Sequence, residues 1–166
     1  MKIISTLLVF LISCSLSSIS FAGNIQCEKD NEALRSMAMS TVTFTRTDGT
    51  TLDVQARIAD TGQKRSAGFQ RVCSETIAKT PILFVFQESF IPSFHMNNVV
   101  SSLDIAFIRP DASIDSIQRM YPYILISIDK PLYSSSSPVN AALETYPGFF
   151  KENNIDLNSS LSWELN

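Results

Sequence analysis

The sequence contains little glycine, few cysteines and no excess of basic residues, and each shortage excludes a class of protein. Five scattered Gly among 166 residues do not form a collagen repeat or a glycine-rich phosphate-binding loop. Three Cys exclude a small scaffold that depends on many disulfides. The net charge is −3, which offers no basic surface to a nucleic acid. With 45% hydrophobic residues, the composition predicts one globular domain that does not bind nucleic acid.

The N-terminus has the pattern of a secretory signal peptide. Met1-Lys2 is followed by an apolar run at residues 3–12, and Ser20-Phe21-Ala22 places small residues where signal peptidase cleaves. We therefore expect residues 1–22 to be removed and the mature protein to be periplasmic or secreted. The apolar run is shorter than the ~20 residues that span a bilayer, so we expect no transmembrane segment in the mature chain.

A second interpretation of the same region stays open. Leu11-Ile12-Ser13-Cys14 resembles a bacterial lipobox, in which Cys14 would be lipidated and would become the mature N-terminus. The hydrophobic segment before Cys14 is short for this purpose. The alternative to soluble export is thus a lipoprotein anchored through Cys14.

Cleavage after Ala22 leaves two cysteines, Cys27 and Cys73. In an oxidising compartment an even number of thiols favours a disulfide, and no Cys-x-x-Cys spacing suggests a metal site. We predict a Cys27–Cys73 disulfide, with two separate buried thiols as the alternative.

The remaining chain reads as a lead-in followed by one β-rich domain. Residues 23–40 show no sustained hydrophobic period and are interpreted as a weakly ordered lead-in. From residue 41 to residue 166 we expect about eight short strands, two short helices and a long loop over residues 121–138 that contains one extended piece. Asp48-Gly49 is a strong hairpin signal between the first two strands. The expected strands are 41–46, 51–58, 81–86, 93–98, 102–109, 113–120, 141–145 and 161–165, and the expected helices are 62–67 and 147–154. This order predicts an antiparallel β-sandwich or barrel.

Several segments of this domain resemble the domain-of-unknown-function 192 family. Ile82-Leu83-Phe84-Val85-Phe86, Phe94-His95-Met96-Asn97-Asn98 and Leu103-Asp104-Ile105-Ala106-Phe107-Ile108 are similar to its G-M-L-F-V-F, F-W-M-K-N-T and P-L-D-I-A-F-I-D segments. Arg65-Ser66-Ala67-Gly68-Phe69 and Leu143-Glu144 fall in the expected order. The resemblance covers residues 42–163 and implies a mostly β, jelly-roll-like domain that is often exported. His95 and Asn97 replace the family's Trp and Lys, which puts any shared cleft chemistry in doubt.

The segment 94–98 is the first candidate for a binding site. It holds the single histidine, and a loop carried by a rigid sheet is a common position for ligand contacts. We expect a cleft between this segment and the 121–138 loop, where tyrosines would suit a saccharide-like surface. The structural alternative is that Phe94 and Met96 face the core, His95 faces solvent and Asn98 bonds a turn. The candidate ligand-binding residues are Phe94, His95, Met96, Asn98, Asp104, Tyr121 and Tyr133.

Two carboxylates could carry chemistry. Asp104 and Glu144 lie in apolar runs, and if they faced one cleft their repulsion would create an acid/base pair. The alternative is that each bonds backbone N–H groups or an arginine such as Arg65, Arg109 or Arg119.

Other chemistries have weaker support. No G-x-S-x-G motif accompanies the single histidine, so nucleophilic catalysis is not expected. The thioethers of four methionines with His95 could bind Cu(I), but methionine also fills gaps in cores. Those methionines are Met37, Met39, Met96 and Met120. We predict no cofactor and no metal.

The leading functional hypothesis is an exported, non-enzymatic module that binds a small molecule or a saccharide. A hydrolase that uses Asp104 and Glu144 is one alternative. The other is an interaction protein that docks a component of the envelope through the same surface.

Overall fold

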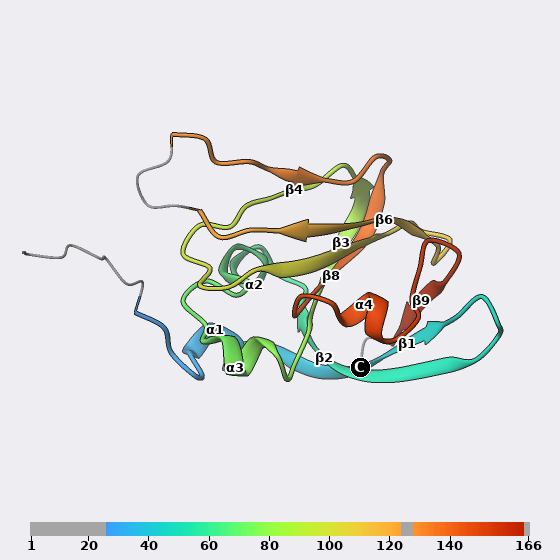
Figure 1. Cartoon of the computed structure of the whole chain (residues 1–166), viewed down its shortest axis with the longest axis horizontal. Helices are drawn as coiled ribbons and strands as arrows, with labels where there is room; N and C mark the ends of the chain where they lie inside the picture. Colours follow the sequence, from blue (N-terminus) through green and yellow to red (C-terminus); the bar gives the residue numbers. More distant parts are fainter. Residues whose placement is uncertain (1–25, 124–127, 165–166) are drawn as a thin grey trace, which may run out of the picture.

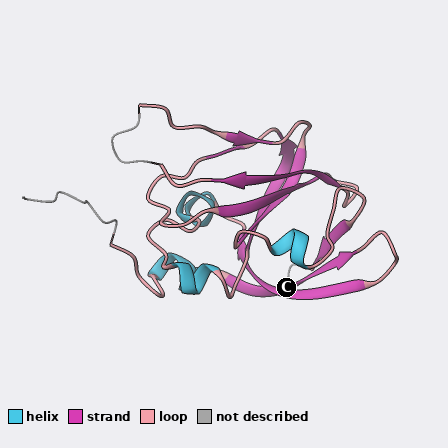
Figure 2. Cartoon of the chain, in the orientation of Figure 1, coloured by secondary structure: helices cyan, strands magenta, loops and turns pink. Residues whose placement is uncertain are grey.

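The computed structural model describes residues 26–123 and 128–164, which form a mostly β structure with four short helices (Figure 2). The strands are β1 (Ala38–Thr45), β2 (Thr51–Ala59), β3 (Ile82–Phe90), β4 (Ser93–Phe94), β5 (Leu103–Ile108), β6 (Ile114–Met120), β7 (Tyr133–Ser134), β8 (Val139–Thr145) and β9 (Ser160–Trp163). The helices are α1 (Glu32–Ser36), α2 (Gly62–Ala67), α3 (Ser74–Ile77) and α4 (Phe149–Glu152). The β-rich class is confirmed, and α1 and α3 add to the two helices that were expected.

Seven strands form one sheet in the order β6-β5-β8-β3-β2-β1-β9, while β4 and β7 form a separate small sheet. The pairing of β2 with β3 is parallel and the other pairings are antiparallel, so the large sheet is mixed rather than antiparallel throughout. A single bridge between Ser113 and Ser160 joins the two ends of the sheet. The fold is sandwich-like, and the sheet does not close into a barrel.

The first hairpin forms as its turn residues predict. Thr45 pairs with Thr51, and the register continues along both strands to Ala38 and Ile58. Gly49 has a φ of +80°, which glycine adopts without steric cost. The Asp48 carboxylate accepts a hydrogen bond from the Thr50 N–H at 2.9 Å and closes the turn.

Hydrophobic side chains pack on both faces of the large sheet. On one face, Phe44, Leu83 and Leu143 pack with α4, which lies beside β9 and β1 in Figure 1. On the other face, Phe84 and Ile105 belong to a second cluster that is completed by side chains from α1, α3 and the loops around β4. The strands β5 and β8 carry buried side chains on both of their faces. Polar groups on these strands are therefore taken out of water.

Residues 26–40 are better ordered than a weakly structured lead-in. Asn31 caps α1 by accepting a hydrogen bond from the Leu34 N–H at 2.9 Å. Leu34 is fully buried, and Met37 is buried one helical turn later. The helix and its C-cap residue contribute only two apolar side chains at helical spacing to the core, which is too short a pattern to give a periodic signal.

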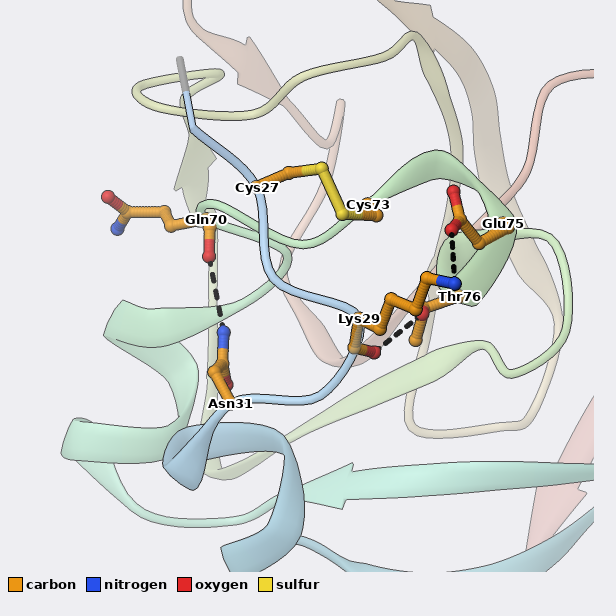
Figure 3. The surroundings of a disulfide bond; sticks show 7 residues. All are labelled: Cys27, Lys29, Asn31, Gln70, Cys73, Glu75 and Thr76. Atoms are coloured by element: carbon orange, nitrogen blue, oxygen red, sulfur yellow. Dashed lines mark hydrogen bonds and ion pairs between the residues drawn. A yellow bond between two sulfur atoms is a disulfide. The ribbon is translucent and has the colours of Figure 1, made fainter.

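Cys27 and Cys73 form a disulfide, as predicted (Figure 3). The segment around Glu28 runs beside Val72, with hydrogen bonds from the Glu28 N–H to the Arg71 carbonyl and from the Cys73 N–H to the Glu28 carbonyl. Asn31 donates to the carbonyl of Gln70 at 3.5 Å. The disulfide thus fastens the N-terminal segment to the loop that follows α2. None of the helices in the described residues is long and apolar enough to cross a membrane.

Candidate functional site

A cleft of about 330 Å³ lies on the face of the sheet that carries Phe84, between α2 and the segment from β3 to β4. Its lining residues are Gly62, Arg65, Ser66, Ala67, Gly68, Phe69, Gln70, Phe84, Phe86, Phe90, Pro92, Ser93, Phe94, His95, Val99 and Glu144. The volume is at the lower end of the range for small-molecule pockets. The cleft is therefore a candidate site for a small ligand.

Aromatic rings form much of its wall. Phe84 and Phe86 are two residues apart on β3, so their side chains face the same side of the sheet. Phe94 meets Phe84 edge to face with ring centroids 5.0 Å apart, and Phe90 meets Phe86 with centroids 4.9 Å apart. Such edge-to-face contacts favour a fixed arrangement of the rings. The cleft therefore offers flat apolar surfaces that are already in place.

The opposite wall begins with α2 and ends at a glycine. The Thr61 side chain caps the helix by accepting from the Lys64 N–H, and the helix stops at Gly68, whose φ is +46°. A Cβ at this position would lie 3.5 Å from the Phe84 ring and 3.7 Å from Oε2 of Glu144. These are ordinary van der Waals contacts, so the positive φ at Gly68, rather than a lack of space, is what favours glycine here.

Glu144 is the acidic group of the cleft. It lies on β8 between Ile82 of β3 and Ile105 of β5, and only 4% of the residue is exposed. Its Oε2 atom is buried and has no hydrogen-bond partner among the residues that the structure describes. Burial raises the pKa of the Glu144 carboxyl to about 8, because the charged form loses the solvation of water. At neutral pH the carboxyl is predominantly protonated.

Arg65 brings a positive charge to the same cleft. It donates through one nitrogen to the carbonyls of Asp60 at 2.8 Å and Val85 at 2.9 Å, and its guanidinium lies 5.7 Å from the centre of the Phe86 ring. Among the described residues, no carboxylate lies within ion-pair distance of it. The cleft thus combines an unpaired guanidinium with a neutral carboxyl.

The 94–98 segment contributes two of its candidate residues to the cleft. Phe94 and His95 line it, whereas Met96 is buried in the core. Asn98 has a φ of +56° and donates to the Gln70 side chain at 3.0 Å, so it supports the wall without lining it. Met96 therefore faces the core, as in the structural alternative, whereas the Asn98 amide bonds a side chain rather than the backbone of a turn.

Asp104 does not share the cleft with Glu144. Asp104 pairs with Thr145 while Glu144 pairs with Ile105, and neighbouring residues of a strand point to opposite faces. Asp104 forms a two-pronged ion pair with Arg119 and accepts from the Gly148 N–H at 2.7 Å. Its hydrogen bond raises the pKa of the Arg119 guanidinium. The structure corrects the idea of an acid/base pair, since Asp104 joins β5 to β6 and to the turn before α4.

The tyrosines also lie outside the cleft. β7 pairs with β4, with Phe94 opposite Tyr133, so the two segments that were expected to flank a cleft are hydrogen-bonded to each other. The Tyr133 hydroxyl accepts from the Tyr121 N–H, and the Tyr123 hydroxyl donates to the Pro131 carbonyl. Tyr121 itself is 59% exposed. The cleft lies on the α2 side of Phe94, where the sequence interpretation did not place it.

Three of the four methionines considered for copper are core side chains. Met37, Met96 and Met120 are buried in one core cluster, and Met39 is exposed on β1. Among the described residues, no three His, Cys, Asp or Glu side chains gather at a place where they could hold a metal ion.

Sequence reasoning missed Arg65, Gly68 and Phe86 as site residues. The family resemblance could have pointed to these residues, because four of the segments that carry it meet at the cleft. These segments are 65–69, 82–86, 94–98 and 143–144. Their convergence depends on the parallel β2–β3 pairing and on the position of β8 between β3 and β5. Neither feature has a local sequence pattern.

Comparison with known proteins identifies a family and a fold. The DUF192 family model, described as "Uncharacterized ACR", matches residues 43–163. A crystal structure of a "putative transcription regulator" from Sinorhizobium meliloti 1021 is similar with a TM-score of 0.67 and 24% identity, over 77% of this chain and 95% of that chain. A protein of unknown function from Novosphingobium aromaticivorans DSM 12444 is similar with a TM-score of 0.65 and 22% identity, over 81% and 99% of the respective chains. No curated protein matches.

Proposed function

The chain belongs to the DUF192 family, and for this member we propose a role as a small-molecule-binding module of the cell envelope that catalyses no reaction. One observation carries the proposal: a buried Glu144 oxygen without a hydrogen-bond partner lies in the wall of an aromatic cleft. Buried polar groups are nearly always hydrogen-bonded, so an exception needs an explanation. A ligand that completes the hydrogen bond supplies one.

The geometry favours binding over hydrolysis. A glycosidase-like reaction needs two carboxyl groups on one substrate, and Asp104 points away from Glu144 into an ion pair with Arg119. The lining also favours a compact amphipathic molecule over a saccharide. The benzene rings in the cleft belong to phenylalanines, while the hydroxyls of Tyr123 and Tyr133 bond backbone groups within residues 121–133.

A location in the envelope is part of the proposal. The apolar run at residues 3–12 and the Cys27–Cys73 disulfide both support export to an oxidising compartment. Intact-mass measurement of the protein recovered from its natural host tests this. A soluble envelope protein that begins at Gly23 is expected. A mass that corresponds to lipidated Cys14 would replace soluble export by membrane anchoring, and a mass that retains residues 1–22 would reject processing at either site.

Binding in the cleft can be tested with benzyl alcohol, a neutral aromatic probe. Titration followed by ¹H–¹⁵N NMR should shift the amide signals of Gly68, Phe86 and Phe94, which surround the cleft. Ser66→Trp places an indole at the cleft wall and should abolish the shifts. Ser74→Trp, at an exposed position of α3 that does not line the cleft, is the matched control and should leave them intact.

Absence of shifts at saturating probe would count against a small-molecule site. In that case the cleft face becomes a candidate for docking an envelope component, which was the third hypothesis. Shifts that persist in Ser66→Trp would place the probe elsewhere and would equally reject the proposed site.

A further inference from the structure

We infer that the cleft binds small organic acids with a flat apolar body, whose carboxylate is held by the Arg65 guanidinium and by the Glu144 carboxyl as hydrogen-bond donor. This inference rests on the proposed function and adds the chemical class of the ligand. It follows from the charges and the hydrogen-bonding groups that face the cleft.

The charge of the cleft favours an anion. Among the described residues, Arg65 has no carboxylate within ion-pair distance and interacts with Asp60 only at longer range. Glu144 is the single acidic group among the residues that line the cleft. An arginine in a partly desolvated site recognises a carboxylate through parallel hydrogen bonds. Because Glu144 carries a proton at neutral pH, it does not neutralise Arg65. A cationic ligand would be repelled by the guanidinium.

The charged groups around Glu144 also bear on the preference for an anionic ligand. On the sheet, Arg57 of β2 lies in the same row as Glu144, with Ile82 between them, but it pairs with Asp30 at 4.0 Å and does not line the cleft. From the covering layer, α2 contributes Arg65, and the segment after β4 contributes His95. Asp60, directly before α2, interacts electrostatically with Arg65 but is held by Lys64 at 2.8 Å. The basic side chains that line the cleft itself are those of Arg65 and His95. A protonated carboxyl has one O–H donor, and a bound carboxylate is the strongest acceptor that a small organic molecule can offer it.

The apolar part of the ligand follows from the walls. Phe86 and Phe94 are half-buried, so part of each ring faces the cleft. A flat ring can stack on or meet these faces edge-on, as the phenylalanines already do with one another. With about 330 Å³ of space, the cleft suits a single ring with a short acidic side chain.

Three probes with the same phenyl group separate the possible head groups: phenylacetate, phenylacetamide and 2-phenylethylamine. Isothermal titration calorimetry of the mature protein at pH 6.5 should give an affinity for phenylacetate at least about tenfold higher than for phenylacetamide, as a charge-assisted hydrogen bond implies. 2-Phenylethylamine should bind more weakly than either.

Variants of the two polar groups test their roles. Arg65→Gln should lower the affinity for phenylacetate by about tenfold or more and leave that for phenylacetamide nearly unchanged. Lys64→Gln removes the same charge one residue away, outside the cleft, and should have little effect. Because Arg65 also holds two backbone carbonyls, Arg65→Lys provides a variant that keeps the charge. It should bind phenylacetate more weakly than the wild type and more tightly than Arg65→Gln.

The pH dependence identifies the donor. Wild-type affinity for phenylacetate should fall as the pH rises past 8, since ionised Glu144 loses its donor and repels the ligand. Glu144→Gln keeps an N–H donor and should bind at pH 6.5 without this loss at higher pH. His95→Asn removes the imidazole that also lines the cleft, and its profile above pH 8 should match the wild type.

The outcomes distinguish this inference from the proposed function. Tighter binding of phenylacetamide or 2-phenylethylamine, blocked by Ser66→Trp, would overturn the ligand class and leave a small-molecule site in place. An unchanged phenylacetate affinity in Arg65→Gln would also overturn it. No binding of any probe, together with no benzyl alcohol shifts in the cleft, would overturn both.

Discussion

Asp104 and Glu144 lie on the adjacent strands β5 and β8, one register position apart, and point to opposite faces of the sheet. Asp104 is held by Arg119 and the Gly148 N–H, whereas Glu144 has an unpartnered oxygen among apolar side chains. The two acidic side chains therefore have different roles in one sheet. The first carboxylate stabilises the fold, and the second faces the candidate binding site.

Replacing Asp104 should destabilise the protein without affecting the cleft. Asp104→Ala leaves the Arg119 guanidinium and the Gly148 N–H without their acceptor, and we expect a loss of about 2–4 kcal/mol in the free energy of unfolding. Urea denaturation measures it. Asp53→Ala, at an exposed carboxylate on β2, is the control and should cost much less. A loss for Asp104→Ala as small as that of the control would contradict a structural role.

Glu144 should make the protein less stable as the pH rises. Its ordinary pKa of 4.5 in the unfolded chain rises to about 8 in the fold. Between these values the folded protein holds a proton that the unfolded chain has released, so the free energy of unfolding falls with increasing pH. The expected loss is a few kcal/mol across this window.

Glu144→Gln should remove that dependence and make the protein more stable than the wild type at pH 8. Glu88→Gln, at an exposed position on β3, should retain the wild-type slope. Denaturant unfolding at intervals between pH 5 and pH 8 provides the comparison. Parallel curves for the wild type and Glu144→Gln would show that the carboxyl ionises normally in the fold.

Much of the fold could be predicted because its signals are local. Asp48-Gly49 identifies a hairpin, the apolar run at residues 82–86 identifies a buried strand, and two cysteines beyond residue 22 indicate a disulfide. The parallel pairing of β2 with β3 and the central position of β8 depend on contacts between distant segments. Strand periodicity does not specify a strand's partner, so these features were not accessible from the sequence.

The N-terminal helix should contribute to stability, contrary to what its sequence suggested. Leu34→Ala removes a fully buried side chain from the core and should cost about 2–5 kcal/mol. Ala33, one position earlier and only partly buried, provides the control substitution Ala33→Ser. Thermal and urea unfolding compare the two variants. If Leu34→Ala were as stable as Ala33→Ser, the packing of α1 would not matter for stability.

The disulfide should stabilise the N-terminal segment and the adjoining wall of the cleft. Cys27 and Cys73 are 46 residues apart, and on the chain-entropy model closing such a loop is worth up to about 4 kcal/mol. The double variant Cys27→Ser with Cys73→Ser should lose stability toward that limit. Hydrogen exchange should become faster at Glu28 and Cys73, whose amides bond across the two segments. Unchanged exchange there would mean that the segment is held without the covalent link.

The candidate site was harder to predict than the fold. Phe94 and His95 were identified because the single histidine lies in an aromatic loop, and both line the cleft. The predicted position of the cleft was wrong, because Phe94 pairs with Tyr133 on the side where the cleft was expected. The orientation of Glu144 relative to Asp104 depends on the register between β5 and β8, which are far apart in the sequence.

The ionisation of Glu144 tests the central claim most directly. ¹³C NMR can follow the Glu144 side-chain carboxyl with pH, with its signal assigned by its absence in Glu144→Gln. The account predicts a midpoint near pH 8 in the free protein and a higher midpoint with saturating phenylacetate, since a bound carboxylate favours the protonated form. A midpoint below about pH 6 that phenylacetate does not change would contradict it, because a normally ionised carboxyl cannot donate the proposed hydrogen bond.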